Sequence, residues 1–272
     1  MSLKLYFDEQ IAERNIEKIS FDSELWESYK GAGGNIKEQI ISLVNGTADF
    51  EEISECIFEE ISHQMSFYKA TYLVLPYLVE SLKEKEKEDD FQGQMNLISK
   101  MGICLGTDVK WMNDEEADEV VMNYYNNAKE ILKEKTKSFI NTYENEIIES
   151  DEDIKSMFIT ALPAIFGNPE FTFLMTMNYW EECSLICSEC EYMDEGMEIE
   201  DDELQIEKAE DVLGKWDGKD FEDTYVWYSN IIAAIDESYL EKLKLYFGTY
   251  TCPECGKKEK VTSCMKDYYI LG

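Results

Sequence analysis

The chain has 272 residues, and 59 acidic side chains against 25 basic ones give it a formal net charge of −34 at pH 7. This charge argues against binding to nucleic acid phosphates or to an anionic membrane surface, because both would repel it. One histidine leaves little material for a histidine-rich metal centre or proton relay. Hydrophobic residues at 44% and aromatic residues at 13% still supply a core. The composition therefore predicts a folded acidic protein of one large or two modest domains.

The N-terminal segment and the apolar runs bear on localisation. Residues 1–10 carry Asp8 and Glu9 and lack the positive and apolar segments of a secretory signal. The densest apolar run, 72–79, contains Pro76 and is far shorter than the roughly 18 residues that a membrane-spanning helix needs. We therefore expect a cytoplasmic protein. Cysteines stay reduced there, so paired cysteines indicate metal or redox chemistry rather than a disulfide framework.

Apolar residues recur at three- and four-residue steps along most of the chain, which is the spacing of amphipathic helices. In chain order, helices are predicted over 36–44, 50–61, 120–140, 151–166 and 221–246, the last with a break near 236–238. Only four prolines and 14 glycines are available for the turns of an all-β protein. The chain is therefore predicted to be mainly α, built from short antiparallel helix pairs, with a small β element near its C-terminus.

An acidic block lies between the helical patterns that end at residue 166 and begin at residue 221. Residues 191–220 contain 13 acidic residues and three lysines, a net charge of −10. Such a block usually stays solvated, so we expect a loop with one short helix at 205–213; the alternative is an acidic surface for a basic partner. The predicted domains are 1–181, helical, and 182–272, a metal-binding element divided by an acidic helical insertion at about 195–248.

Two C-x-x-C pairs are the strongest chemical signal in the sequence. Cys187 and Cys190 form the first pair, and Cys252 and Cys255, followed by Gly256, form the second. Four thiolates match the ligand number and softness of a tetrahedral Zn²⁺ site. Short strands on either side of the second pair, at 249–251 and 260–262, complete the pattern of a zinc ribbon, in which two cysteine knuckles face each other. The separation between Cys190 and Cys252 is much longer than in compact sites of this type.

Three alternatives to structural zinc remain at this point. A rubredoxin-like iron centre uses the same four thiolates. A thioredoxin-type redox pair needs a βαβ setting that the sequence lacks, and four free cysteines are the third alternative. The remaining cysteines are interpreted as bystanders: Cys56 and Cys104 as small buried residues within helices, and Cys183 and Cys264 as neighbours of the ribbon.

No catalytic machinery is recognisable. Glu60 and His63 match the Glu-x-x-His element of di-iron bundles, but such sites need two copies and His63 is the only histidine. The glycines at 31–34 lack the lysine of a phosphate-binding loop and are interpreted as a flexible connector. No catalytic residues are therefore predicted.

Segments 63–72 and 75–80, with His63-Gln64, Tyr68-Lys69-Ala70-Thr71 and Pro76-Tyr77-Leu78, resemble the HEAT-like α-solenoid proteins of bacterial polymorphic-toxin and contact-dependent systems. Segment 245–256 is similar to the C-terminal cysteine knuckle of some members. The resemblance implies that 1–181 is an irregular HEAT-like helical-repeat array with an interaction role, such as that of a toxin-neutralising immunity protein.

The function expected from these observations is a non-enzymatic interaction or scaffold protein with a basic protein partner, and with neither nucleic acid nor membrane as a partner. Opposite charge would speed association with a cationic toxin. The alternatives are a zinc-ribbon regulatory adaptor whose charge serves solubility, and an enzyme with an unrecognised carboxylate site.

Overall fold

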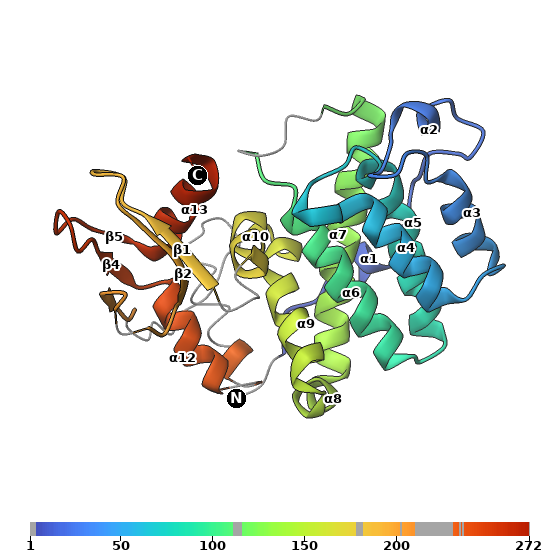
Figure 1. The fold of residues 1–272 in the computed structure, drawn as a ribbon. Coiled ribbons are helices and arrows are strands. Elements are labelled where there is room, and N and C mark those ends of the chain that lie inside the picture. The colour runs from blue at the N-terminus through green and yellow to red at the C-terminus, as the bar shows by residue number, and fades with distance from the viewer. Residues whose placement is uncertain are drawn as a thin grey trace. The chain divides into compact units, whose positions relative to one another are not determined.

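The structure is a computed structural model that describes residues 4–110, 116–177, 182–201, 203–209, 231–233, 235 and 237–271 (Figure 1). The chain divides into two compact units, Lys4–Thr172 and Phe173–Gly272, which are described separately below. The predicted fold class, mainly α with small antiparallel β elements near the C-terminus, is confirmed. The predicted boundary between 181 and 182 stays a prediction, and 178–181 lie outside the described residues.

The first unit is helical. Its elements are α1 Glu9–Ala12, α2 Leu25–Ser28, α3 Lys37–Asn45, α4 Phe50–Ser62, the 3₁₀ turn η1 His63–Met65, α5 Thr71–Lys87, α6 Phe91–Gly106, α7 Glu119–Thr142, α8 Glu144–Glu149 and α9 Glu152–Ile165. The helix α10, Pro169–Met177, follows. The four helices predicted between residues 36 and 166 therefore form, with ends within a few residues of the apolar pattern.

Side-chain caps fix several of these helix ends. Asp49 accepts hydrogen bonds from the N–H groups of Glu51 and Glu52 at the start of α4, at 3.0 and 3.1 Å. Asp90 accepts one from Gly93 N–H at the start of α6, at 2.9 Å. Both satisfy amides that have no partner within their own helix.

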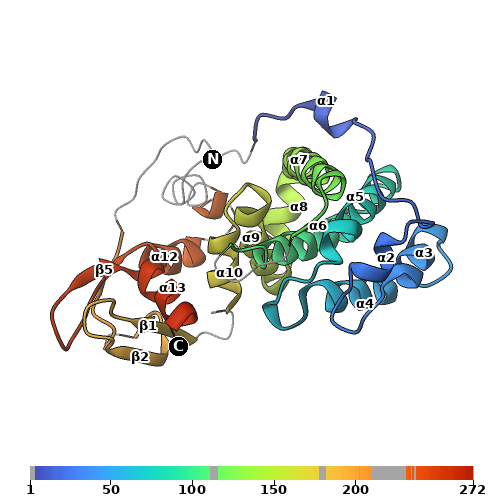
Figure 2. The same ribbon diagram turned by 90° about the horizontal axis from the view of Figure 1, so that it is seen from above.

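The core of the helical unit lies around α5, which packs against α6 and α7, while α6 packs against α9 (Figures 1 and 2). Residues 71–79 of α5 are all buried, as expected for a helix that is surrounded by others. Gly102 of α6 permits the close approach of α9, because a Cβ atom there would lie 2.6 Å from both Cβ and the carbonyl oxygen of Ala161. The glycine at position 102 therefore allows the short distance between α6 and α9.

The turn before α5 is held by a threonine rather than by its histidine. His63 is exposed, and its Nδ1 lies 3.3 Å from Glu59 Oε2. The Thr71 hydroxyl instead donates to the carbonyl oxygen of Ile61 at 3.1 Å. Threonine can do this because its hydroxyl lies close to its own backbone, whereas the histidine ring extends into solvent.

The second unit contains two small antiparallel sheets. The first pairs β1 Glu182–Ile186 with β2 Met193–Glu198, and the second has the order β3 Ile206–Glu207, β4 Thr249–Thr251, β5 Lys258–Lys260. Helix α12, Glu237–Tyr246, precedes β4, and α13, Val261–Leu271, follows β5. The residues of 221–246 before 231 lie outside the described part of the chain.

Two local predictions in this unit are corrected. The prediction of a helix at 205–213 is wrong for the described residues 205–209. Ile206 and Glu207 form strand β3 and pair with Tyr250 and Thr249. The second strand of the ribbon hairpin ends at Lys260, and α13 starts at Val261. At β3, pairing with the distant strand β4 overrides the local pattern, whereas β5 ends because helix α13 begins at the next residue.

Candidate metal centre

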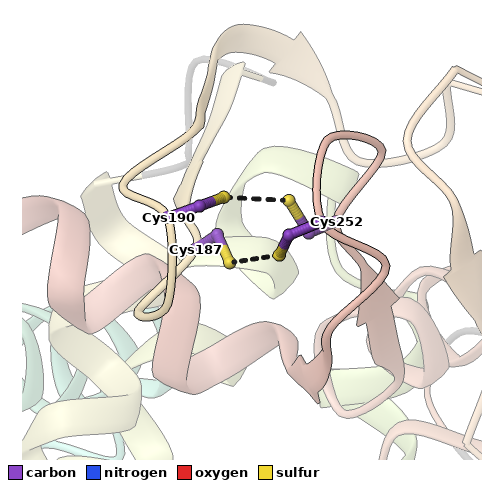
Figure 3. Close-up of side chains that lie close together, drawn as sticks. Cys187, Cys190 and Cys252 are labelled. Carbon is purple, nitrogen blue, oxygen red and sulfur yellow. Dashed lines mark hydrogen bonds between the residues drawn. The ribbon is translucent and has the colours of Figure 1, made fainter.

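Each cysteine pair lies in the loop of a two-stranded hairpin. The loop 187–192 joins β1 to β2, and the loop 252–257 joins β4 to β5. The predicted ribbon arrangement, with one knuckle per hairpin and the two knuckles facing each other, is visible in Figure 3. The long chain segment between the pairs therefore leaves one hairpin and returns to the other.

The two loops have the same length and the same backbone hydrogen bonds. In the first, Cys187 N–H donates to the Tyr192 carbonyl and Glu191 N–H donates to the Cys187 carbonyl, both at 2.9 Å. In the second, Cys252 N–H donates to the Lys257 carbonyl and Gly256 N–H to the Cys252 carbonyl, also at 2.9 Å. Both loops are thus closed in the same way around the first cysteine of the pair.

The matching residues Glu191 and Gly256 both take a left-handed backbone conformation, with φ of 58° and 74°. This conformation turns the chain sharply after the second cysteine of each pair. Glycine adopts it without a steric penalty, whereas a side chain at this position costs free energy. Gly256 therefore correctly indicated a turn with positive φ after the second pair, whereas the first knuckle forms the same turn with Glu191 in place of a glycine.

The four side chains converge. The Sγ atoms of Cys187, Cys190, Cys252 and Cys255 all lie within 4.8 Å of one another. Cys187 and Cys255 are 3.6 Å apart, as are Cys190 and Cys252 (Figure 3). A disulfide has sulfurs about 2.05 Å apart, whereas a tetrahedral site with bonds of about 2.3 Å has sulfur–sulfur edges of about 3.8 Å. The cluster has the dimensions of a four-thiolate metal site and could hold a metal ion.

Backbone amides within the knuckles point at the sulfurs. Burial raises the pKa of Cys187, against the opposing effect of hydrogen bonds from the N–H groups of Cys190 and Glu189. At Cys252 burial also raises the pKa, but the N–H groups of Cys255 and Glu254 help to outweigh it, and the pKa falls to about 7. Amide donors of this kind stabilise thiolate, which is the form that ligates a metal.

A polar network beside the cysteines links the two knuckles directly. Ser188 of the first loop donates from its N–H to Glu259 of β5 at 3.1 Å, and from its hydroxyl to the same carboxylate at 2.5 Å. Lys257 of the second loop lies 3.2 Å from Glu259 and donates to the Ser188 hydroxyl at 2.7 Å. The Tyr250 hydroxyl of β4 also donates to Asp194 of β2, at 2.6 Å.

The sequence interpretation missed this network, because serine, lysine and glutamate carry no signal until the two loops face each other. Its lysine adds a positive charge next to four sulfurs that would carry negative charge as ligands. Groups of this kind around a metal site orient the ligands and offset their charge.

The other four cysteines stay outside the cluster. Cys104, Cys183 and Cys264 are buried, and burial raises the pKa of each to about 12, so these thiols stay protonated. Cys56 is exposed, which corrects its predicted burial. It lies on the outer face of α4, beside the apolar positions that do face the core.

The two motifs set aside in the sequence have structural roles. The Glu60 carboxylate accepts a hydrogen bond from Gly33 N–H at 2.6 Å, and its carbonyl accepts one from Ala32 N–H at 2.8 Å. The glycine-containing loop is thus held by Glu60 rather than left as a free connector.

Comparisons with models of protein families, with curated proteins and with solved structures find no match for this chain. Among the described residues, no helix combines the length and the apolar character that crossing a membrane requires. The features that describe the protein are therefore its mainly helical fold and its four-cysteine cluster.

Proposed function

We propose that Cys187, Cys190, Cys252 and Cys255 bind one structural Zn²⁺ ion, and that the chain is a non-enzymatic interaction protein for a basic protein partner. The observation that supports the zinc site is the convergence of four Sγ atoms within 4.8 Å from two closed loops. Since all four positions of a tetrahedral site are then filled by the protein, none is left for a catalytic water. The metal joins the two hairpins, and these residues take no part in a reaction.

The metal is tested by elemental analysis of freshly purified protein. We expect about one zinc per chain in the wild type and none after Cys252→Ser. Cys56→Ser removes an exposed thiol outside the cluster and should keep the zinc. Iron in place of zinc would show visible absorption and would overturn the zinc assignment alone. Protein without any metal would overturn the site as a whole.

The partner is inferred from charge. With a net charge of −34, the protein attracts a basic surface over long range and raises the association rate with it. A HEAT-like immunity protein that neutralises a cationic toxin is the specific form of this proposal. It predicts that co-expression with a protein encoded beside it yields a complex, and that growth inhibited by that neighbour is rescued.

The salt dependence of binding separates this proposal from the adaptor alternative. If charge drives recognition, the association rate should fall steeply as the ionic strength rises, because the Debye length shrinks to about 8 Å at 0.15 M salt. A rate that is insensitive to salt would favour an adaptor that binds through its knuckles. Failure to form a complex with any neighbouring protein, together with no rescue of growth, would contradict the immunity role.

A further inference from the structure

A groove of about 830 Å³ opens in the helical unit. It is bordered by the starts of α4 and α6 and by the turn from α8 into α9, and the end of α5 supplies one further side chain. These segments are far apart in the sequence, and the packing of α6 against α9 brings them together. The groove lies entirely within this unit and is independent of the cysteine cluster.

The groove has an uncompensated negative charge. Six carboxylates and two lysines line it. The lysines are already paired, Lys85 with Glu88 and Asp90 at 3.1 Å each, and Lys100 with Glu55. Asp49 and Asp90 cap helices. The other carboxylates belong to Glu51, Glu146, Glu149 and Asp151; they are exposed and have no cationic partner in the described part of the chain.

Two further features of the groove fit a ligand that is both cationic and partly apolar. Phe91, Ile154 and Met157 are partly exposed and supply apolar surface in the same groove. At the rim, Lys85 Nζ already lies 4.4 Å from the centre of the Phe50 ring, so this wall holds a cation against an aromatic face. Independently of the acidic residues, Asn96 lines the groove with a buried side-chain oxygen that has no hydrogen-bond partner. A buried acceptor without a partner is rare in native proteins, and this one belongs to a partly exposed residue at the wall of the groove.

We propose that this groove binds an arginine-bearing segment of the basic partner, an inference that rests on the proposed function and assigns it a site. The unpaired groups of the groove are acceptors, and arginine is a side chain that only donates. Its guanidinium offers five N–H groups to several carboxylates, and its apolar stem packs on the aromatic and methionine surface. The groove is larger than one side chain, so neighbouring apolar residues of the segment enter it as well.

The test uses the full-length chain and a fluorescein-labelled decapeptide in which arginine alternates with leucine. Binding is measured by fluorescence anisotropy. The groove variant is Glu51→Gln, Glu146→Gln, Glu149→Gln, and the control variant is Glu38→Gln, Glu116→Gln, Glu119→Gln. Each variant loses three exposed carboxylates of the helical unit, so both change the net charge equally, and only the first set lines the groove. Thermal melting monitored by circular dichroism confirms that both remain folded.

We expect the groove variant to weaken peptide binding about tenfold or more and the control variant to change it about twofold or less, because local pairing exceeds the screened effect of net charge. A peptide that alternates arginine with glycine should bind the wild type more weakly, since it lacks the apolar contacts. Equal weakening of peptide binding in both variants would contradict the groove as the binding site, and so would full competition by spermidine at the same concentration of positive charge. Either result would leave the proposal of a basic partner standing. No salt-dependent binding of the peptide to any form would overturn both.

Discussion

At the scale of single residues, backbone conformation is decisive in the two cysteine knuckles. Glu191 and Gly256 occupy the same position after the second cysteine of each pair, and both have positive φ. The chain thus uses glycine in one loop and accepts a strained glutamate in the other. The two loops nevertheless close with the same hydrogen bonds. The loop closure therefore determines the positive φ at this position, and the residue type there changes only how stable the loop is.

Gly256→Ala should destabilise the second knuckle by about 1 kcal/mol, because a Cβ atom is unfavourable in the left-handed region. Gly256→Asn is the matched control and should cost less, since asparagine tolerates this conformation better. Chemical denaturation of the protein, purified in the presence of the proposed zinc, measures both. Equal stability of the alanine and wild-type proteins would show that the loop is more adaptable than its φ of 74° indicates.

Asp90 provides a residue-scale prediction about pH. The hydrogen bond from Gly93 N–H lowers the pKa of Asp90, against an opposing effect of burial and with further help from Lys85. A lowered pKa in the folded state means that the charged form stabilises the protein above the ordinary aspartate pKa of about 3.9. This contribution is lost as the pH falls through the lower pKa of the folded state.

Asp90→Asn keeps the capping oxygen and removes the charge, so at pH 7 it should cost about 0.5 kcal/mol. The difference from wild type should shrink below the ordinary aspartate pKa and disappear below the lower pKa of the folded state. Urea denaturation at a series of pH values measures it, with the exposed loop variant Asp22→Asn as a control. A difference that persists unchanged at low pH would contradict the assignment to charge.

At the scale of secondary-structure elements, the helical unit depends on the contact of α6 with α9, and the C-terminal unit depends on two hairpins. Gly102 sets the first contact, where backbone and Cβ atoms of Ala161 lie closest. The hairpins are joined by the Ser188, Lys257 and Glu259 network in addition to the four cysteines. The groove also arises at this scale, since the α6 and α9 pairing brings its carboxylates together.

Gly102→Ala should lower the free energy of unfolding by about 1–3 kcal/mol, which is typical of an added methyl group in a packed interface. The stability gained from a better helix former is smaller than this steric cost. Thermal and chemical denaturation measure the effect. A neutral or stabilising result would mean that α6 and α9 can separate without loss of packing.

At the scale of the whole molecule, the two units depend on different sources of stability. The helical unit has a large apolar core around α5 and contains none of the four clustered cysteines. The C-terminal unit has short strands and contains all four. Small β elements of this size rarely hold together without a metal or disulfides. Metal binding and folding of the second unit are therefore expected to be coupled.

Removal of the proposed zinc with a chelator should unfold β1, β2, β4 and β5 while the helices between Phe50 and Ile165 remain folded. Hydrogen exchange followed by mass spectrometry measures protection in each segment separately. Cys252→Ser should reproduce the effect of the chelator, and Cys56→Ser should not. Retained protection of both hairpins after metal removal would show that the polar network alone is sufficient.

The sequence by itself determined the helices α3, α4, α7 and α9, through apolar periodicity, and the identity of the four clustered cysteines, through their spacing and the chemistry of thiolates. Those signals are local, and each is complete within a few turns of chain. Only the tertiary structure decided that Ile206 joins a strand, that Cys56 faces outward, that Ser188 meets Glu259, and that four unpaired carboxylates share a groove. These features depend on contacts between segments that are distant in the sequence. The local sequence pattern is compatible with several arrangements, and tertiary packing determines which of them forms.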